Sequence, residues 1–420
     1  MSCWINAAAA RHPDRIAIEG PERSFTYVEL RDAAVAGAEA LGGVRRAAIA
    51  LAPGEDFVVA LHACLLAGAA AVPIDLRLSL GEREERLAGA QVVIDARLAG
   101  QPARPGRESG SEDPDVAVMH TSGTTAVPKP VVLTQRNFEA SALGSAVALG
   151  LDQNERWLCP MPLTHVGGLS IPIRSAIYAT TAVLQGRFDT EAVLAELMDP
   201  ARRITLVSLV PTMLARLLDA GLEHPPTLRW ALLGGGPIAP ALLERATAAG
   251  IPVAPTYGMT EACSQIATFG WPLPGVEVRV ADDGEVLVRG PIISVGALAD
   301  DGWLHTGDLG RFDDRSRLEI IGRKADTIVT GGENVAPTEV ETALLEHPAV
   351  ADAAVHPRAD PEWGEAVVAT VVLRDGATAA AEELRAHCAA RLAAFKVPKA
   401  VEFADGLPRT ASGKLLRRQL

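Results

Sequence analysis

The sequence predicts an α/β protein. It has a large amino-terminal domain of layered α/β subdomains, with mostly parallel sheets and a small β-rich subdomain, followed by a small α+β domain. Short apolar segments alternate with alanine-rich helical segments as far as Trp271, and beyond it short strands and turns replace the long helices. We place the domain boundary in a polar stretch, which divides the chain into residues 1–325 and 326–420.

The amino-terminal part repeats a strand–helix pattern. Thr26 and Glu29 form a capping-box pattern that opens a helix toward Leu41, and further helices are expected at residues 56–67 and after Pro211. Because strand–helix–strand units join parallel strands, a parallel sheet is expected. The apolar strands are expected at residues 15–18, 46–51, 70–74, 115–119, 182–184, 205–210, 228–233 and 253–255.

The rest of the chain contains a hairpin and a compact α+β pattern. Residues 277–280 and 285–288 alternate as strands around an Ala-Asp-Asp-Gly turn. Short strands at 318–321 and 327–329 flank the domain boundary, and a helix starts at Pro337. Two longer strands and a helix are expected at residues 353–356, 366–373 and 379–394.

Composition and charge exclude several classes of protein. The 420 residues are 48% hydrophobic, enough for sizeable cores, and the formal net charge of -13 argues against a nucleic-acid surface. The five cysteines form no CxxC pair, which favours reduced thiols over disulfides or zinc. No segment resembles a signal peptide or is apolar enough to span a bilayer. We therefore expect a cytoplasmic protein without membrane insertion.

A hydroxyl-rich loop follows the predicted strand at 115–119. Backbone N–H groups, hydroxyls and an ammonium at a strand end can bind a polyphosphate. The loop is not a Walker A motif, because Pro128 and Pro130 flank the lysine where that motif needs Gly and Ser or Thr. By itself it fits a flexible surface loop equally well. Its candidate residues are Thr121, Ser122, Gly123, Thr124, Thr125 and Lys129.

Three later clusters carry further candidate side chains. Thr260 and Glu261 follow an apolar strand, where a carboxylate can bind Mg²⁺, although a helix-start glutamate has the same pattern. Asp308 follows a glycine turn and can accept hydrogen bonds from ribose hydroxyls, but such an aspartate is more often a turn residue. Lys414 lies near the carboxyl terminus, where a lysine is usually a solvated charge.

Together and in this order, the motifs resemble those of the adenylate-forming superfamily of acyl-CoA synthetases, nonribosomal adenylation domains and luciferases. The resemblance covers nearly the whole chain and is carried by residues 121–125, 128–129, 257–261, 306–308, 322–326, 331–334 and 408–414. Within the superfamily the chain is most similar to the o-succinylbenzoate–CoA ligases of menaquinone biosynthesis, through residues 162–170, 233–237 and 260–266.

The resemblance implies a two-step reaction that uses ATP, Mg²⁺ and coenzyme A. A substrate carboxylate attacks the α-phosphate of ATP and expels pyrophosphate, and the CoA thiol then cleaves the acyl-adenylate. Lys414 would bridge the carboxylate and the α-phosphate, Thr260 would contact that phosphate, and Glu261 would hold Mg²⁺. The other implied ATP-binding residues are Thr121, Ser122, Gly123, Thr124, Thr125, Lys129, Gly234, Gly235, Gly236, Tyr257, Gly258, Met259, Asp308 and Arg323.

The resemblance also implies that the small domain is mobile. It would rotate after adenylation, withdraw the catalytic lysine and bring in a CoA loop formed by Gly331, Gly332 and Glu333. Asp326 matches the hinge position, and a charged residue in a polar boundary suits that role. An ordinary loop aspartate is the alternative.

For the acyl pocket, His165 matches a family position that lines the substrate channel, and we also count it among the catalytic candidates. Taken alone, it fits a packed histidine better. Arg174 lies in an apolar context, and a buried arginine is costly unless it meets an anion. We hypothesise that it recognises the carboxylate of o-succinylbenzoate that is not activated, whereas a structural ion pair is the alternative. The expected acyl-contacting residues are His165, Arg174, Ser208, Thr212, Gly258 and Ser264.

Several other functions share these core motifs. They are another aryl or short-chain acyl-CoA ligase, a stand-alone adenylation enzyme that loads a carrier protein, and a non-enzymatic nucleotide-binding module, which Glu261 together with Lys414 disfavours. Two departures from the family stand out: Ala126 and Pro130 replace common glycines, and the stretch 268–302 is short. The short stretch 268–302 leaves open whether the chain forms a homodimer.

Overall fold

The computed structural model describes residues 4–87, 89–98, 113–121, 129–409 and 415–420. These residues form two compact units, each described separately below. The first contains residues up to 235, 249–277 and 288–304, and the second contains residues 236–248, 278–287 and 305–420. The domain boundary expected between residues 325 and 326 stays a prediction.

A nine-stranded sheet is the frame of the first unit. Its strands, in spatial order, are β14 (Trp271–Pro272), β13 (Ser264–Thr268), β12 (Val253–Met259), β11 (Trp230–Leu233), β10 (Leu206–Leu209), β8 (Arg156–Cys159), β9 (Thr181–Leu184), β1 (Ile16–Glu19) and β2 (Ser24–Thr26). The strands from β12 to β1 are parallel, whereas β2, β13 and β14 run antiparallel to their neighbours. Because the carboxyl ends of parallel strands lie along one edge, the residues that follow them are brought together there.

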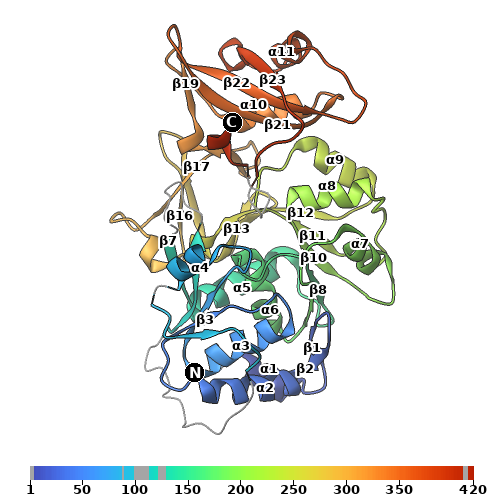
Figure 1. The fold of residues 1–420 in the computed structure, drawn as a ribbon, viewed down its shortest axis with the longest axis vertical. Coiled ribbons are helices and arrows are strands. Elements are labelled where there is room, and N and C mark those ends of the chain that lie inside the picture. Colours follow the sequence, from blue (N-terminus) through green and yellow to red (C-terminus); the bar gives the residue numbers. More distant parts are fainter. Residues whose placement is uncertain (1–3, 88, 99–112, 122–128, 410–414) are drawn as a thin grey trace. The chain divides into compact units, whose positions relative to one another are not determined.

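A second sheet of the same unit has five strands. In order they are β5 (Val92–Ile94), β3 (Arg46–Ile49), β4 (Ala70–Pro73), β6 (Asp115–Thr121) and β7 (Lys129–Thr134). The first four are parallel, and β7 pairs antiparallel with β6. The mostly parallel arrangement of both sheets confirms the predicted fold class (Figure 1).

The helices of this unit cover the sheets and form its core. They are α1 (Trp4–Arg11), α2 (Tyr27–Ala40), α3 (Glu55–Ala67), α4 (Leu80–Arg86), α5 (Gln135–Leu149), α6 (Val166–Tyr178), α7 (Thr190–Met198) and α8 (Pro211–Asp219). The predicted capping box of α2 is confirmed, because the Glu29 N–H donates to Thr26 Oγ1 and the Glu29 carboxylate accepts from the Thr26 N–H at 2.8 Å.

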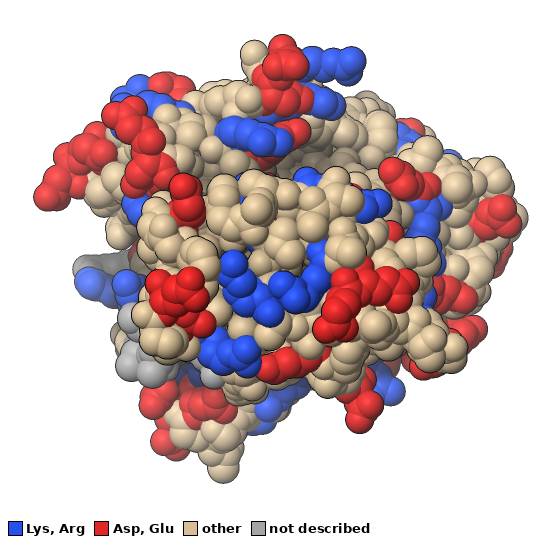
Figure 2. All heavy atoms as spheres, turned by 90° about the horizontal axis from the view of Figure 1, so that it is seen from above, with Lys and Arg blue, Asp and Glu red and all other residues tan. Residues whose placement is uncertain are grey.

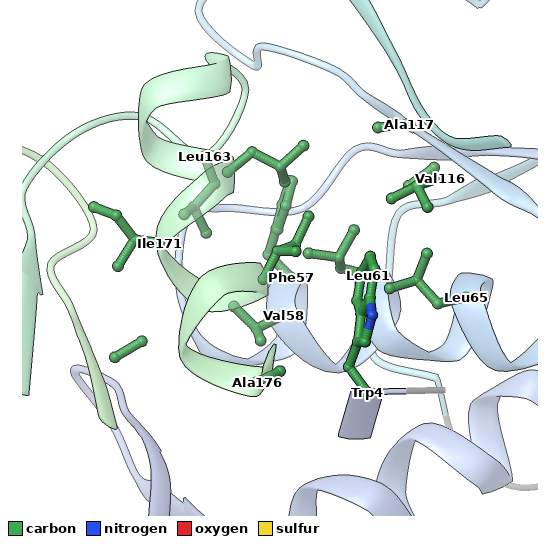
Figure 3. Close-up of a cluster of buried hydrophobic side chains, with 14 of the residues drawn as sticks. Trp4, Phe57, Val58, Leu61, Leu65, Val116, Ala117, Leu163, Ile171 and Ala176 are labelled. Carbon is green, nitrogen blue, oxygen red and sulfur yellow. The ribbon is translucent and has the colours of Figure 1, made fainter. Parts of the chain in front are cut away.

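Helix α3 is the centre of the main hydrophobic core, and nearly all of its residues are buried. Figure 3 shows its side chains Phe57, Leu61 and Leu65 in one cluster with Ile171 of α6 and Val116 of β6. The same core holds residues of both sheets. The helix is therefore apolar on every side, as expected for a helix enclosed by other elements.

Most of the second unit is β-structure. Its four-stranded sheet runs β15 (Glu277–Val280), β16 (Glu285–Arg289), β17 (Leu304–Phe312) and β18 (Leu318–Arg323). Its five-stranded sheet contains β20 (Glu333–Val335), β19 (Ile328–Thr330), β22 (Gly364–Leu373) and β21 (Val350–Asp360), with β23 (Ala400–Phe403) paired to β22. The helices are α9 (Pro240–Ala248), α10 (Pro337–Leu345) and α11 (Ala381–Ala389), and a separate apolar core joins the last two to this sheet.

Two local predictions differ from the structure. The helix expected at residues 379–394 ends at Ala389, because its buried side chains are Leu384 and Cys388 and the next three residues are exposed. Packing, and not alanine content, decides where a short helix ends. The expected glycine turn before Asp308 is instead part of strand β17.

The surface carries charges of both signs. Figure 2 shows acidic and basic side chains intermixed on one face of the molecule. Within the described ranges, every helix is too short or too polar to cross a bilayer.

Helix α3 carries a buried histidine, His62. It is 1% exposed, and neither ring nitrogen has a hydrogen-bond partner among the described residues. Burial lowers the pKa of His62 to about 4, so the ring is neutral in the folded protein at neutral pH.

The stability of the protein should depend on His62 in acid. The unfolded chain binds a proton at a pKa of about 6.5 and the folded chain only near 4, so stability is lost as the pH falls through this window. His62→Leu should reduce the loss of unfolding free energy between pH 7 and pH 5 by about 2 kcal/mol, measured by urea unfolding. An unchanged loss would show that burial does not lower the pKa of His62 in the folded protein.

Candidate functional site

Neighbouring parallel strands of the first unit end beside one another and lead into most of the predicted site residues. Strand β8 is followed by residues 160–165, β10 by the start of α8, β11 by Gly234 and Gly235, and β12 by Thr260 and Glu261. Crevices at the carboxyl ends of such strands are where open α/β sheets bind ligands. The parallel sheet thus assembles segments separated by about a hundred residues of sequence.

The β12–β13 turn has an unusually tight backbone. Gly258 pairs with Gln265, Met259 pairs with Ser264, and the register shifts between Tyr257 and Gly258. A Cβ atom on Gly258 would lie 1.7 Å from the carbonyl oxygen of Ser264, so only glycine fits there. Ser264 itself has φ +94°, a conformation that non-glycine residues rarely adopt and that is often found at functional sites.

Thr260 and Glu261 form the short helix η1 (Thr260–Ala262) that closes this turn. Both are half-buried, and the Glu261 backbone carbonyl accepts a hydrogen bond from the Ser294 N–H at 2.8 Å. Within the described part of the chain, no Lys, Arg or His lies within 4.0 Å of the Glu261 carboxylate, and no group of three or more potential metal ligands exists. One half-buried carboxylate fits Mg²⁺ as that ion is held beside nucleotides, with phosphates completing its shell.

Gly234 lies where a side chain would strike the next strand. A Cβ atom on Gly234 would approach the carbonyl oxygen of Thr256 to 2.9 Å, which explains the glycine at this strand end. Gly235 has φ +79°, which also favours glycine, and Gly236 is exposed. The close packing against Thr256 and the positive φ of Gly235 together require glycines at this strand end.

The described residues on either side of the hydroxyl-rich loop belong to two neighbouring strands. Thr121 at the end of β6 pairs with Lys129 at the start of β7, and its hydroxyl donates to the Lys129 carbonyl at 3.5 Å. Lys129 is exposed. Ser122, Gly123, Thr124 and Thr125 lie outside the described residues, so their roles stay predictions.

His165 is the residue immediately before α6 and is half-buried. Burial lowers its pKa, and the positive charge of Arg77 lowers it further against the opposing effect of Asp75. The imidazole is therefore neutral at neutral pH, and one nitrogen can accept a hydrogen bond while the other donates.

Arg174 lies on the same helix, nine positions along the chain and roughly 13 Å from His165 along the axis. It is 2% exposed, and its guanidinium donates to Ser141 Oγ at 2.8 Å and lies 5.7 Å from the Trp157 ring centroid. Burial lowers the pKa of Arg174. Across the described residues, no carboxylate lies within 4.0 Å of it, so its charge is uncompensated by an ion pair.

Arg174 connects two other predicted acyl-contacting residues. The Trp157 indole N–H donates to Ser208 Oγ at 3.0 Å, and the Ser141 hydroxyl donates to the Cys263 carbonyl at 2.7 Å, next to Ser264. Thr212 is half-buried in the first turn of α8. Trp157 and Ser141 were missed by sequence reasoning, because only the fold brings them to Arg174.

In the second unit, the two predicted ribose-binding residues lie together. Asp308 on β17 is paired in register with Arg323 on β18, and the Arg323 Nε lies 2.7 Å from the Asp308 carboxylate. Next to them, Glu285 accepts from the Gly307 N–H at 3.0 Å and pairs with Lys324 at 3.0 Å. A network of this kind holds Asp308, which is 4% exposed, in a fixed position.

The predicted CoA loop packs against an aromatic residue that sequence reasoning missed. A Cβ atom on Gly331 would lie 2.8 Å from the Trp363 ring, and the Gly331 N–H donates to the Trp363 carbonyl at 2.8 Å. The Lys399 ammonium lies 4.2 Å from the centroid of the same ring. Gly332 and Glu333 are exposed beside it, and Lys414 lies outside the described residues.

A groove of about 610 Å³ beside the ends of β1 and β9 contains none of the predicted site residues. Both carboxylates that line it already have cation partners, because Glu19 pairs with Arg156 and Glu196 with Arg202. The strand ends described above carry the polar groups that a nucleotide and an acid require, so we place the site there and not in this groove.

Comparison with known families identifies the class of protein. The family described as AMP-binding enzyme matches residues 5–108 and 95–297, and the family described as AMP-binding enzyme C-terminal domain matches residues 339–414. The chain belongs to the AMP-binding enzyme family, which confirms the resemblance to adenylate-forming enzymes.

Within this family, the chain is similar to ligases that join succinylbenzoate to coenzyme A. The 2-succinylbenzoate–CoA ligase of Bacillus licheniformis is 38% identical, with 99% of this chain and 98% of the relative covered, and that of Bacillus velezensis is 37% identical, with 99% and 97% covered. The o-succinylbenzoate CoA synthetase of Bacillus subtilis in complex with ATP and magnesium ion has a TM-score of 0.90 at 36% identity, covering 100% of this chain and 99% of that one.

The β12–β13 turn gives a direct test of this geometry. Gly258→Ala should lower the free energy of unfolding by about 3 kcal/mol, because the new methyl group meets backbone atoms that cannot move independently. Gly296→Ala is the matched control: Gly296 is exposed with no atom within 4 Å, and the change should stay within about 0.5 kcal/mol. Equal stability of both variants would mean that the turn relaxes freely.

Proposed function

We infer that this chain is an AMP-forming acid–CoA ligase that converts o-succinylbenzoate, ATP and coenzyme A into o-succinylbenzoyl-CoA, AMP and pyrophosphate in menaquinone biosynthesis. Full-length relatives with this activity in their names support the inference, as does a solved relative bound to the acyl-adenylate intermediate OSB-AMP with a TM-score of 0.89. Within this structure, the observation that carries the choice of acid is Arg174, a buried cation that has no carboxylate partner among the described residues.

The first half-reaction joins two anions and therefore needs positive and hydrogen-bonding groups. A carboxylate oxygen attacks the α-phosphorus, and the bond to the β-phosphate oxygen breaks as pyrophosphate leaves. Thr260 offers a hydroxyl to the α-phosphate, Lys129 offers an ammonium to the departing phosphates, and Lys414 stabilises the charge shared by the carboxylate and α-phosphate. Asp308 and Arg323 hold the ribose hydroxyls, and the backbone at Gly234 faces the adenylate.

Magnesium assists the departure of pyrophosphate when it is bound. Glu261 is the residue that would hold it, since its carboxylate has no protein cation as a partner within the described chain. A single protein carboxylate leaves the other coordination positions for phosphate oxygens and water. Mg²⁺ would then neutralise charge on the leaving group.

In the second half-reaction the CoA sulfur attacks the acyl carbonyl carbon and AMP leaves with the bonding electrons. We propose that the loop of Gly331, Gly332 and Glu333 guides the thiol. Trp363, against which Gly331 packs, offers an aromatic face and Lys399 an ammonium beside it, which suit the adenine ring and phosphates of CoA. Asp326 is proposed as the hinge between the two half-reactions.

The choice of a dicarboxylic acid follows from the energetics of Arg174. Burying a guanidinium without an opposite charge is costly, and such a group persists where a ligand supplies the missing charge. In a monocarboxylic acid, the only carboxylate is the one that reacts with the α-phosphate. A second carboxylate on the same acid can pair with Arg174, and the Ser141 and Trp157 contacts hold the guanidinium ready for it.

We propose a cytoplasmic location, because the four described cysteines are free and buried, which suits a reducing compartment. We also propose that the protein can form a homodimer, that it does not bind nucleic acids and that it does not insert into membranes.

The reaction is tested by pyrophosphate exchange into ATP across a panel of acids, followed by addition of CoA. We expect o-succinylbenzoate to support exchange and an analogue lacking one carboxylate to do so at least about tenfold less efficiently. Addition of CoA should then yield the thioester and AMP. Exchange without thioester formation would favour a carrier-loading enzyme, and stronger exchange with benzoate or a short-chain acid would favour another acyl-CoA ligase.

Arg174→Met separates substrate recognition from a structural role. We expect the KM for o-succinylbenzoate to rise at least about tenfold, since the second carboxylate loses its partner. The free energy of unfolding without substrate should be unchanged or higher, because a costly buried charge is removed.

Arg229→Met is the matched control. Arg229 pairs with the buried Glu155 at 2.8 Å, so this variant should be destabilised by about 3 kcal/mol with an unaltered KM for the acid. An unaltered KM in Arg174→Met, or a destabilisation equal to that of Arg229→Met, would assign Arg174 to the structural alternative.

A further inference from the structure

Two arginine–carboxylate clamps hold the carboxyl-terminal tail to the second unit. Arg409 donates to both carboxylate oxygens of Asp352 on β21, at 2.9 and 2.8 Å. Arg417, in the short helix η5 (Arg417–Gln419), donates to both oxygens of Glu341 on α10, at 2.5 and 2.9 Å. Arg409 forms an antiparallel β-bridge with Leu415, and the Leu416 N–H donates to the Pro408 carbonyl at 2.9 Å.

The clamp at Arg417 is the better buried of the two. The Arg417 side chain is 17% exposed and that of Glu341 is 9% exposed, whereas the residues of the Arg409 clamp are about one-third exposed. Glu341 also accepts a hydrogen bond from the Val355 N–H at 2.7 Å, so its carboxylate is fixed from two sides. Bidentate pairs in such surroundings have a defined geometry and orient the groups that they join.

Arg417 has a further contact, with a second carboxylate. Its Nε lies 3.3 Å from the Asp326 carboxylate, at the end of the short helix η3 (Lys324–Asp326). Arg417 is three positions after Lys414 in the sequence. Its guanidinium therefore links the carboxyl-terminal tail both to α10 and to Asp326, the residue proposed as the hinge. A backbone rotation at Asp326 moves its carboxylate relative to Arg417, so the ion pair is made in some hinge conformations and broken in others.

We propose that Arg417 is a positioning residue that couples the hinge at Asp326 to the tail carrying Lys414. The ion pair favours one hinge conformation, and so it sets how the enzyme divides its time between adenylation and thioester formation. The pair with Glu341 keeps the guanidinium in place. The coupling rests on the proposed function, because it assigns a conformational role to the hinge of that reaction.

A double-mutant cycle isolates the contact. Arg417→Gln and Asp326→Asn should each change the ratio of the adenylation rate to the thioester-forming rate at least about threefold and in the same direction. The double variant should change it no further than either single variant. Arg358→Gln, which breaks the exposed pair with Glu402 at 2.7 Å in the same unit, is the matched control and should leave the ratio unaltered.

A merely structural role predicts a different pattern. Loss of Arg417 also leaves Glu341 as a buried carboxylate without a partner, so Arg417→Gln lowers the melting temperature whether or not the hinge is involved. Asp326→Asn leaves the Arg417–Glu341 pair intact and reports on the hinge alone. If Arg417→Gln does not fold, Arg417→Lys, which keeps the charge without the planar fork, takes its place in the cycle.

Hydrogen exchange separates this proposal from the proposed function, because it needs no substrate. In the ligand-free full-length protein, the amides of residues 324–328 should exchange several times faster in Arg417→Gln and Asp326→Asn, and at the native rate in Arg358→Gln. The coupling would be overturned if Arg417→Gln and Asp326→Asn exchanged at the native rate. It would also be overturned if their effects on the ratio of adenylation to thioester formation multiplied in the double variant. Faster exchange in a protein that catalyses no pyrophosphate exchange with any acid would retain the coupling and reject the proposed reaction.

Discussion

The parallel direction of the strands from β12 to β1 is the constraint on which the candidate site depends. Because these strands point the same way, the segments after β8, β10, β11 and β12 emerge at one edge of the sheet. Helix α3, buried along almost its whole length, belongs to the core that this sheet shares with the five-stranded sheet. The site is therefore built on packed elements, and its precision comes from a core that contains none of the reacting groups.

The charged side chains of this protein fall into three groups, which differ in burial and in pairing. Exposed pairs such as Arg358–Glu402 contribute little to stability. Largely buried pairs such as Arg417 with Glu341 are matched within the protein and orient the segments that they join. Arg174 is different, because its guanidinium is buried without any carboxylate in the described chain. An unmatched buried charge indicates a ligand of opposite sign, whereas a matched one indicates an architectural role.

Aromatic and hydroxyl groups complete these arrangements. Trp157 lies beneath Arg174 and donates to Ser208, while Ser141 joins Arg174 to the strained turn before Ser264. Trp363 packs on Gly331 and holds Lys399 above its ring. Trp157, Ser141, Trp363 and Lys399 belong to none of the sequence motifs, and the fold brings each of them to its place from a remote part of the sequence.

The sequence by itself determined the strand–helix order, the capping box at Thr26, the hairpin at residues 277–288 and the family, because these depend on local periodicity, turn chemistry and motif spacing. It also indicated Arg174, since an arginine in an apolar segment is unusual at any position. Only the tertiary structure decided that α11 ends at Ala389, that Asp308 lies within a strand, and that Arg174 has no carboxylate partner within the described chain. Those outcomes depend on which distant elements pack together, and burial and pairing are properties of contacts that no local pattern contains.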